Sequence, residues 1–140
     1  MDGLIADWYW VRSLQYIGNK MIKSGYAFQN IDDLSVLNPR LLYPYLDTAT
    51  NLDPHFIAAY SYGAIIMPAI DRTKAIALTE KGIANNPNEW RLYQQLGYIH
   101  WRMGNYEKAA AIYEKGSEIA DAAPSMQMMA ASIATDASSP

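Results

Sequence analysis

The feature of this 140-residue sequence that most limits its fold is a recurrence at an interval of 34 residues. Gly63 and Gly97 are separated by this interval, and so are Gly82 and Gly116, which both follow a Glu-Lys pair. Further pairs at the same or nearly the same interval are Ala75 and Ala109, Asp71 and Asn105, and Pro54 and Pro87. Because a whole set of matches shares one offset, the sequence indicates an internal repeat.

The second copy of the repeat reads as two helices joined by a tight turn. An apolar stripe with helical spacing follows Asn88: Leu92, Leu96, Ile99 and Met103. Gly104 is expected to end this helix, because glycine adopts the left-handed C-cap conformation most easily. Asn88 and Asn105 are expected to cap the two helices. The inner face of the second helix is predicted to comprise Tyr106, Ala109, Ala110, Tyr113 and Ala120.

The first copy follows the same plan. A helix is predicted from Pro54 to about Met67, ended near Pro68, and Asp71 is expected to cap the next helix. The apolar residues of that next helix are Ile76, Leu78 and Ile83. The apolar stretch 54–70 is shorter than the roughly 20 residues of a membrane-spanning helix, so it predicts a buried helix instead.

The two copies resemble the tetratricopeptide repeat. The matching pattern is Tyr93-x-x-Leu96-Gly97-x-x-His100, followed by Ala109-x-x-x-Tyr113, and the resemblance covers residues 56–124. The family usually has tryptophan at the position of Tyr93 and tyrosine at that of His100, and the first copy has Ala59 and Thr79 where large aromatic residues are usual. The resemblance implies an all-α, right-handed α-solenoid of antiparallel helix hairpins, with about three repeats and a trailing helix, and it suggests a bacterial source.

We therefore expect a single domain over residues 1–140. Its predicted parts are an irregular first repeat at 4–53 with an insertion at 24–37, repeats at 54–87 and 88–123, and a trailing helix at 124–135. In the first repeat, helices are predicted from Leu4 to Lys23 and from about Pro39 to Ala49. The last helix has a short, methionine-rich outer face, whereas a natural cap usually has a polar one, so truncation of a longer chain is favoured.

Small residues are expected where two helices approach closely. Gly63, Gly97, Ala75 and Ala109 take this role in the two clear copies, since bulk at these positions would push the helices apart. Gly18 is the corresponding candidate in the irregular first repeat.

Composition limits the kinds of partner. The net charge is -3 and Lys and Arg form no cluster, so the sequence does not predict nucleic-acid binding. There is no cysteine, which excludes disulfides and thiolate chemistry but leaves cytoplasm and periplasm equally open. The N-terminal residues lack the basic and apolar regions of a signal peptide.

No catalytic or metal-binding constellation is found in the sequence. His55 and His100 lack Cys, Asp or Glu at metal-ligand spacing, so capping or packing is the favoured interpretation for both. Asp32 and Asp33 are adjacent, whereas acid-base catalysis needs carboxylates that converge from separate elements. We therefore predict no enzyme activity, no cofactor, no metal and no small-molecule substrate.

The resemblance does imply a partner surface, because in this family the first helix of each repeat lines a concave groove. The corresponding residues here are Gln15, Tyr16, Asn19, Tyr60, Ser61, Met67, Arg91, Gln94, Gln95, Tyr98, Trp101 and Arg102. Aromatic rings beside arginine and amide groups suit peptide recognition. The alternative is that these aromatic residues pack against the next repeat. Some members of the family clamp a C-terminal carboxylate with a set of Lys and Asn residues; Asn19 could belong to such a set, but the matching lysines are absent.

The sequence thus predicts a non-catalytic scaffold that binds a peptide or helix of a partner protein. The alternative hypothesis is self-association, in which the C-terminal helix, with Met128 and Met129, stacks on another copy.

Overall fold

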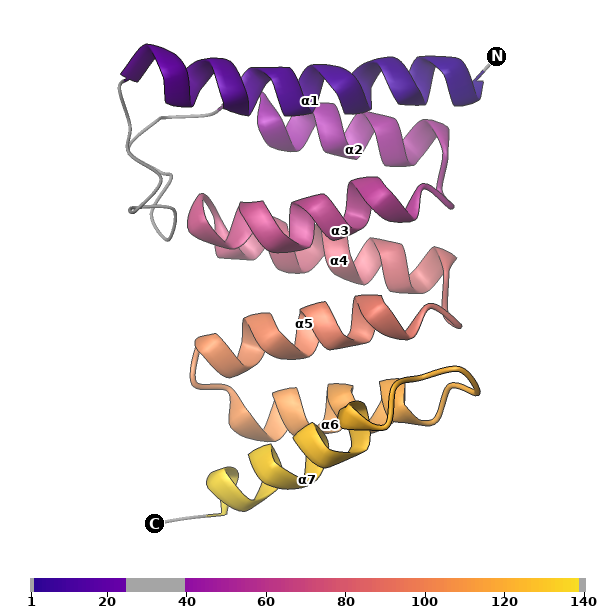
Figure 1. Cartoon of the computed structure of the whole chain (residues 1–140), viewed down its shortest axis with the longest axis vertical. Helices are drawn as coiled ribbons and strands as arrows, with labels where there is room; N and C mark the ends of the chain where they lie inside the picture. The colour runs from indigo at the N-terminus through magenta and orange to yellow at the C-terminus, as the bar shows by residue number, and fades with distance from the viewer. Residues whose placement is uncertain (1, 25–39, 139–140) are drawn as a thin grey trace. The chain divides into compact units, whose positions relative to one another are not determined.

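The computed structural model of the chain describes residues 2–24 and 40–138. These residues form seven α-helices and one 3₁₀ turn, and no strand occurs among them. In chain order the elements are α1 (Asp2–Ser24), α2 (Leu42–Leu52), α3 (Ile57–Ile66), η3 (Met67–Ala69), α4 (Arg72–Asn85), α5 (Trp90–Arg102), α6 (Tyr106–Ser117) and α7 (Ser125–Ala137) (Figure 1). The predicted all-α class is confirmed. The chain divides into two compact units, Met1–Leu78 and Thr79–Pro140.

In the first unit, α1 packs along α2, and α2 packs against α3 (Figure 1). The inward face of α1 is buried at Ala6, Ser13 and Ile17. The buried Ser13 hydroxyl donates a hydrogen bond of 2.6 Å to the carbonyl oxygen of Trp10. On α2, the buried Thr50 hydroxyl likewise donates to the carbonyl oxygen of Leu46 at 2.8 Å. Because both hydroxyls bond to their own helix, they can lie in an apolar core at little energetic cost.

The connection from α3 to α4 follows from one proline and one aspartate. Pro68 has no amide hydrogen for an α-helical hydrogen bond, and the chain passes into the 3₁₀ turn Met67–Ala69 at this point. Asp71 then precedes α4, and its Oδ1 accepts a hydrogen bond of 3.2 Å from the Lys74 amide. This is the N-cap expected from the sequence.

The core between α3 and α4 uses different residues from those of the family pattern. Ala59 occupies a position that is usually a large aromatic residue, and the next residue along the chain, Tyr60, is fully buried in its place. Leu78 of α4 is also fully buried, and a Cβ atom built on Gly63 would collide with its Cδ2 atom. The close approach expected at Gly63 is therefore present, with Leu78 as the residue that requires it.

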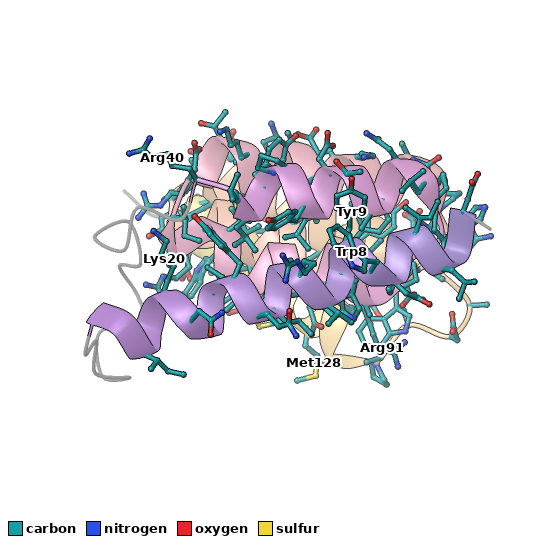
Figure 2. All side chains as sticks on the ribbon, turned by 90° about the horizontal axis from the view of Figure 1, so that it is seen from above. Trp8, Tyr9, Lys20, Arg40, Arg91 and Met128 are labelled. Carbon is teal, nitrogen blue, oxygen red and sulfur yellow. The ribbon has the colours of Figure 1, made fainter. Side chains whose placement is uncertain are left out.

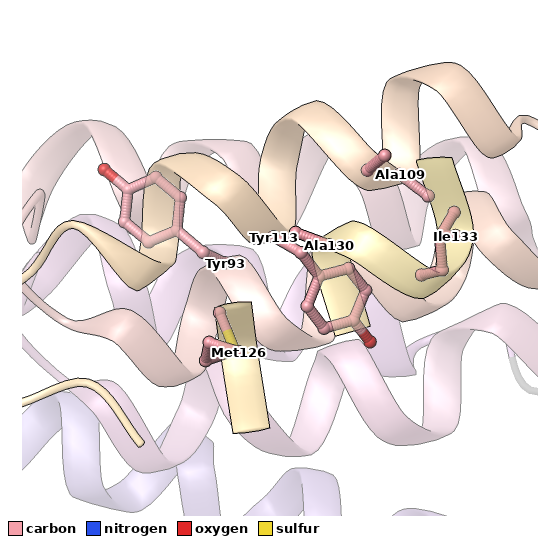
Figure 3. Close-up of a cluster of buried hydrophobic side chains, with 7 residues drawn as sticks. Tyr93, Ala109, Tyr113, Met126, Ala130 and Ile133 are labelled. Atoms are coloured by element: carbon pink, nitrogen blue, oxygen red, sulfur yellow. The ribbon is translucent and has the colours of Figure 1, made fainter. Parts of the chain in front are cut away.

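The second unit has its own apolar core, in which α6 packs against both α5 and α7. Figure 3 shows the buried side chains of this core: Tyr93, Ala109, Tyr113, Met126, Ala130 and Ile133. A Cβ atom on Gly97 would lie 2.6 Å from the ring of Tyr113. A Cβ atom on Gly116 would lie 2.6 Å from Cε of Met126 and 2.7 Å from Cβ of Tyr93. Gly97 thus lies at a close approach as predicted, and Gly116 likewise leaves room for neighbouring side chains.

The turn between α5 and α6 has the geometry predicted at Gly104. This glycine has a φ of 83°, in the left-handed region that other residues rarely adopt. Its amide donates to the carbonyl oxygen of Trp101 at 3.0 Å, and the Asn105 amide donates to that of His100 at 2.9 Å. These two bonds form a Schellman motif, which satisfies carbonyl groups that would otherwise be unpaired at the helix end.

Two of the predicted helix caps are wrong. The residue before α5 is Glu89, not Asn88, and it makes no side-chain capping bond. Asn105 does precede α6, but it makes no side-chain capping bond either. The Nδ2 atom of its side-chain amide lies 3.3 Å from Nδ1 of His100 instead. The Schellman motif brings these two residues together, so the asparagine side chain meets the histidine in preference to the first turn of α6.

Several packing predictions also need correction. Among the described residues, a Cβ atom on Gly18 would meet nothing within 4 Å, so this glycine makes no close contact between α1 and α2. Helix α6 ends at Ser117, so Ala120 lies beyond it and is exposed. Met103 and Tyr106 flank the turn and are exposed as well. The insertion predicted at 24–37 lies outside the described residues apart from residue 24.

Candidate functional site

Helix α5 has two faces with opposite character. Its buried face carries Leu92, Tyr93, Leu96, Gly97, Ile99 and His100. Its other face carries Arg91, Gln94, Gln95, Tyr98, Trp101 and Arg102, which lie together because they recur at helical spacing. We call these six residues the α5 face. Figure 2 includes these side chains and labels Arg91.

Two aromatic rings and one guanidinium group form the centre of the α5 face. The rings of Tyr98 and Trp101 have centroids 5.7 Å apart and are tilted by 38°. Nη1 of Arg102 donates a hydrogen bond of 3.3 Å to the Tyr98 hydroxyl, and the guanidinium carbon lies 6.0 Å from the ring centroid. Tyr98 is 47% exposed even though it has these two neighbours. An exposed ring held by its neighbours loses little side-chain entropy when a partner covers it.

The start of the helix places a second cation on an aromatic ring. The guanidinium carbon of Arg91 lies 4.8 Å from the ring of Trp90, and its Nη1 atom forms an ion pair of 3.2 Å with Glu89. Arg91 itself is exposed. Gln94 is also exposed, whereas Gln95 is half-buried and its Oε1 atom accepts no hydrogen bond from the described residues. Four of the six residues are therefore exposed, whereas Gln95 and Trp101 are half-buried.

The predicted groove residues of the first unit do not form such a surface. Tyr60 is fully buried and Met67 is 1% exposed, so the prediction that they contact a partner is wrong. Both residues are needed in the core, and burial raises the pKa of the Tyr60 hydroxyl. Ser61 is half-buried.

The predicted groove residues of α1 are split between two sides of that helix. Tyr16 is half-buried, with its ring 5.9 Å from that of Tyr45, and its hydroxyl accepts a hydrogen bond of 3.4 Å from the Leu41 amide. It therefore packs α1 against the start of α2. Gln15 and Asn19 are exposed and lie away from the buried face of α1.

The sequence interpretation missed the exposed apolar residues of α1. Trp8, Val11 and Leu14 are all exposed. The buried face of α1 contains Ala6, Ser13 and Ile17 instead. A second apolar spacing, two residues out of step with the buried one, was the signal that could have revealed this outer face.

The two histidines have different environments. His100 is buried, and burial lowers the pKa of its imidazole, as does the nearby charge of Lys108, whereas Glu80 acts in the opposite direction. His55 is exposed, and its backbone amide donates to Oδ1 of Asp53 at 3.2 Å. Within the described residues, no three His, Cys, Asp or Glu side chains come together as metal ligands would. Asp32 and Asp33 lie outside the described residues.

The second unit also has an open hollow of about 650 Å³ near the start of α5 and the end of α6. Its lining residues are Pro87, Asn88, Tyr93, Lys115, Glu118, Ile119, Ala120 and Asp121. The side chains of Lys115, Glu118 and Asp121 are exposed, so none of them has the buried environment that tunes a catalytic group.

In residues 2–24 and 40–138, no helix combines the length and apolarity needed to cross a membrane.

Helix pairs joined by short turns, with glycines at their closest approach, define a helical-hairpin repeat protein. Comparison with protein families identifies the repeat. Residues 91–122, which contain α5 and α6 entirely apart from Trp90, match the tetratricopeptide repeat. Compared with curated proteins, the sequence has no match. Tetratricopeptide repeats are in general protein-interaction modules built on a non-catalytic scaffold.

Proposed function

We propose that this protein is a non-catalytic scaffold whose α5 face binds a peptide segment or a helix of a partner protein. The observation that supports this most directly is the half-exposed ring of Tyr98, held beside Trp101 and Arg102. Aromatic and arginine side chains are the residue types that most often dominate binding energy at protein interfaces. The α5 face contains two arginines and no carboxylate, so the expected partner segment carries an acidic group next to an apolar one.

The clean probes of this face are Tyr98 and Arg102. Both side chains are exposed, so their truncation should leave the fold intact. Trp101 is less suitable, because it is half-buried and packs against the core of the second unit. A Trp101→Ala substitution would therefore change stability as well as binding.

The experiment selects peptides from a displayed random library on the immobilised wild-type protein. Binding of each selected peptide is then measured by calorimetry against Tyr98→Ala, Arg102→Ala and the control Glu114→Ala, which lies on the exposed side of α6. We expect at least a tenfold loss of affinity, about 1.4 kcal/mol, for the first two variants and no loss for the control. Equal affinity for all three variants would show that the α5 face is not the binding site.

A second candidate function is self-association through α7. Met128 is 72% exposed and Met129 is also exposed, and the described outer side of this helix has one charged residue, Asp136. Flexible methionines on a surface with a single charge suit protein contacts. If this face mediates assembly, Met128→Glu together with Met129→Glu should convert an oligomer to a monomer in light scattering. An oligomer that survives both substitutions would exclude α7 as the contact.

A further inference from the structure

We draw no further inference here: the strongest candidate, the exposed apolar side of α1 with Leu4, Trp8 and Ile22, is a helix face without a partner, and nothing in the structure shows what covers it.

Discussion

At the scale of single residues, His100 has the most unusual chemistry. It is a buried polar residue in the core of the second unit, at a position where the family usually has tyrosine. Its Nδ1 atom lies 3.3 Å from the Asn105 amide, and its buried Nε2 atom has no hydrogen-bond partner among the described residues. Burial is the main cause of its lowered pKa, and the nearby Lys108 adds to the effect. The neutral imidazole is therefore the form that the folded protein tolerates.

This lowered pKa makes stability depend on pH in a defined direction. The folded-state pKa of His100 lies below the ordinary value of about 6.5, so as the pH falls the unfolded chain takes up the proton first. Above about pH 6.5 the imidazole is neutral in both states, and the free energy of unfolding is not reduced by its protonation. As the pH falls from there toward the folded-state pKa, protonation of the unfolded chain lowers the free energy of unfolding. We expect His100→Tyr to reduce the loss of unfolding free energy between about pH 7.5 and about pH 5.5. Urea denaturation at both pH values tests this, and an identical loss in both proteins would assign the pH dependence to other groups.

At the scale of helices, the sequence predicted most of what lies between residues 54 and 123. The 34-residue interval located both hairpins, and the helix ends at Pro68, Asp71 and Gly104 followed from backbone chemistry that depends only on local sequence. The caps at Asn88 and Asn105 were wrong, because α5 begins after Glu89 and the Asn105 side chain meets His100 across the turn.

The candidate site was predictable only where helical periodicity determines it. The six residues of the α5 face share one side of one helix, so spacing alone brought them together. Tyr60 was assigned to the wrong surface because it is buried beside the small Ala59, and Met67 is buried as well. The core of that hairpin therefore draws on the neighbouring Tyr60, and a family pattern cannot show such a shift of one residue.

The glycines of α1 and α5 allow a direct test of helix packing. A side chain at Gly97 would overlap the ring of Tyr113, whereas one at Gly18 meets open space. We expect Gly97→Leu to lower the free energy of unfolding by about 3 kcal/mol or more, because α5 and α6 would have to separate. Gly18→Ala should instead raise it by about 0.5–1 kcal/mol through improved helix propensity. Chemical denaturation of both variants measures these changes, and an unchanged Gly97→Leu variant would contradict the close packing.

At the scale of the whole molecule, the notable feature is that the two compact units share one helix. The boundary between Leu78 and Thr79 falls inside α4, which runs from Arg72 to Asn85 without interruption. Repeat proteins gain their cooperativity from the coupling of adjacent parts, so a helix common to both units should make them unfold together. The tryptophans are suited to test this, because Trp8 and Trp10 belong to the first unit and Trp90 and Trp101 to the second.

Substitution of one tryptophan pair at a time by phenylalanine gives a fluorescence reporter for each unit. Within each variant, we expect the fluorescence midpoint to coincide with the midpoint from circular dichroism, as a two-state transition requires. Ala77→Pro should then separate the midpoints. Ala77 is exposed and lies in the interior of α4, where proline removes a hydrogen bond and costs about 3 kcal/mol. Ala77→Gly keeps the amide hydrogen and serves as the control, with midpoints that still coincide. If the fluorescence and circular dichroism midpoints of a variant already differ without the proline, α4 does not couple the units, and the chain unfolds as two independent parts.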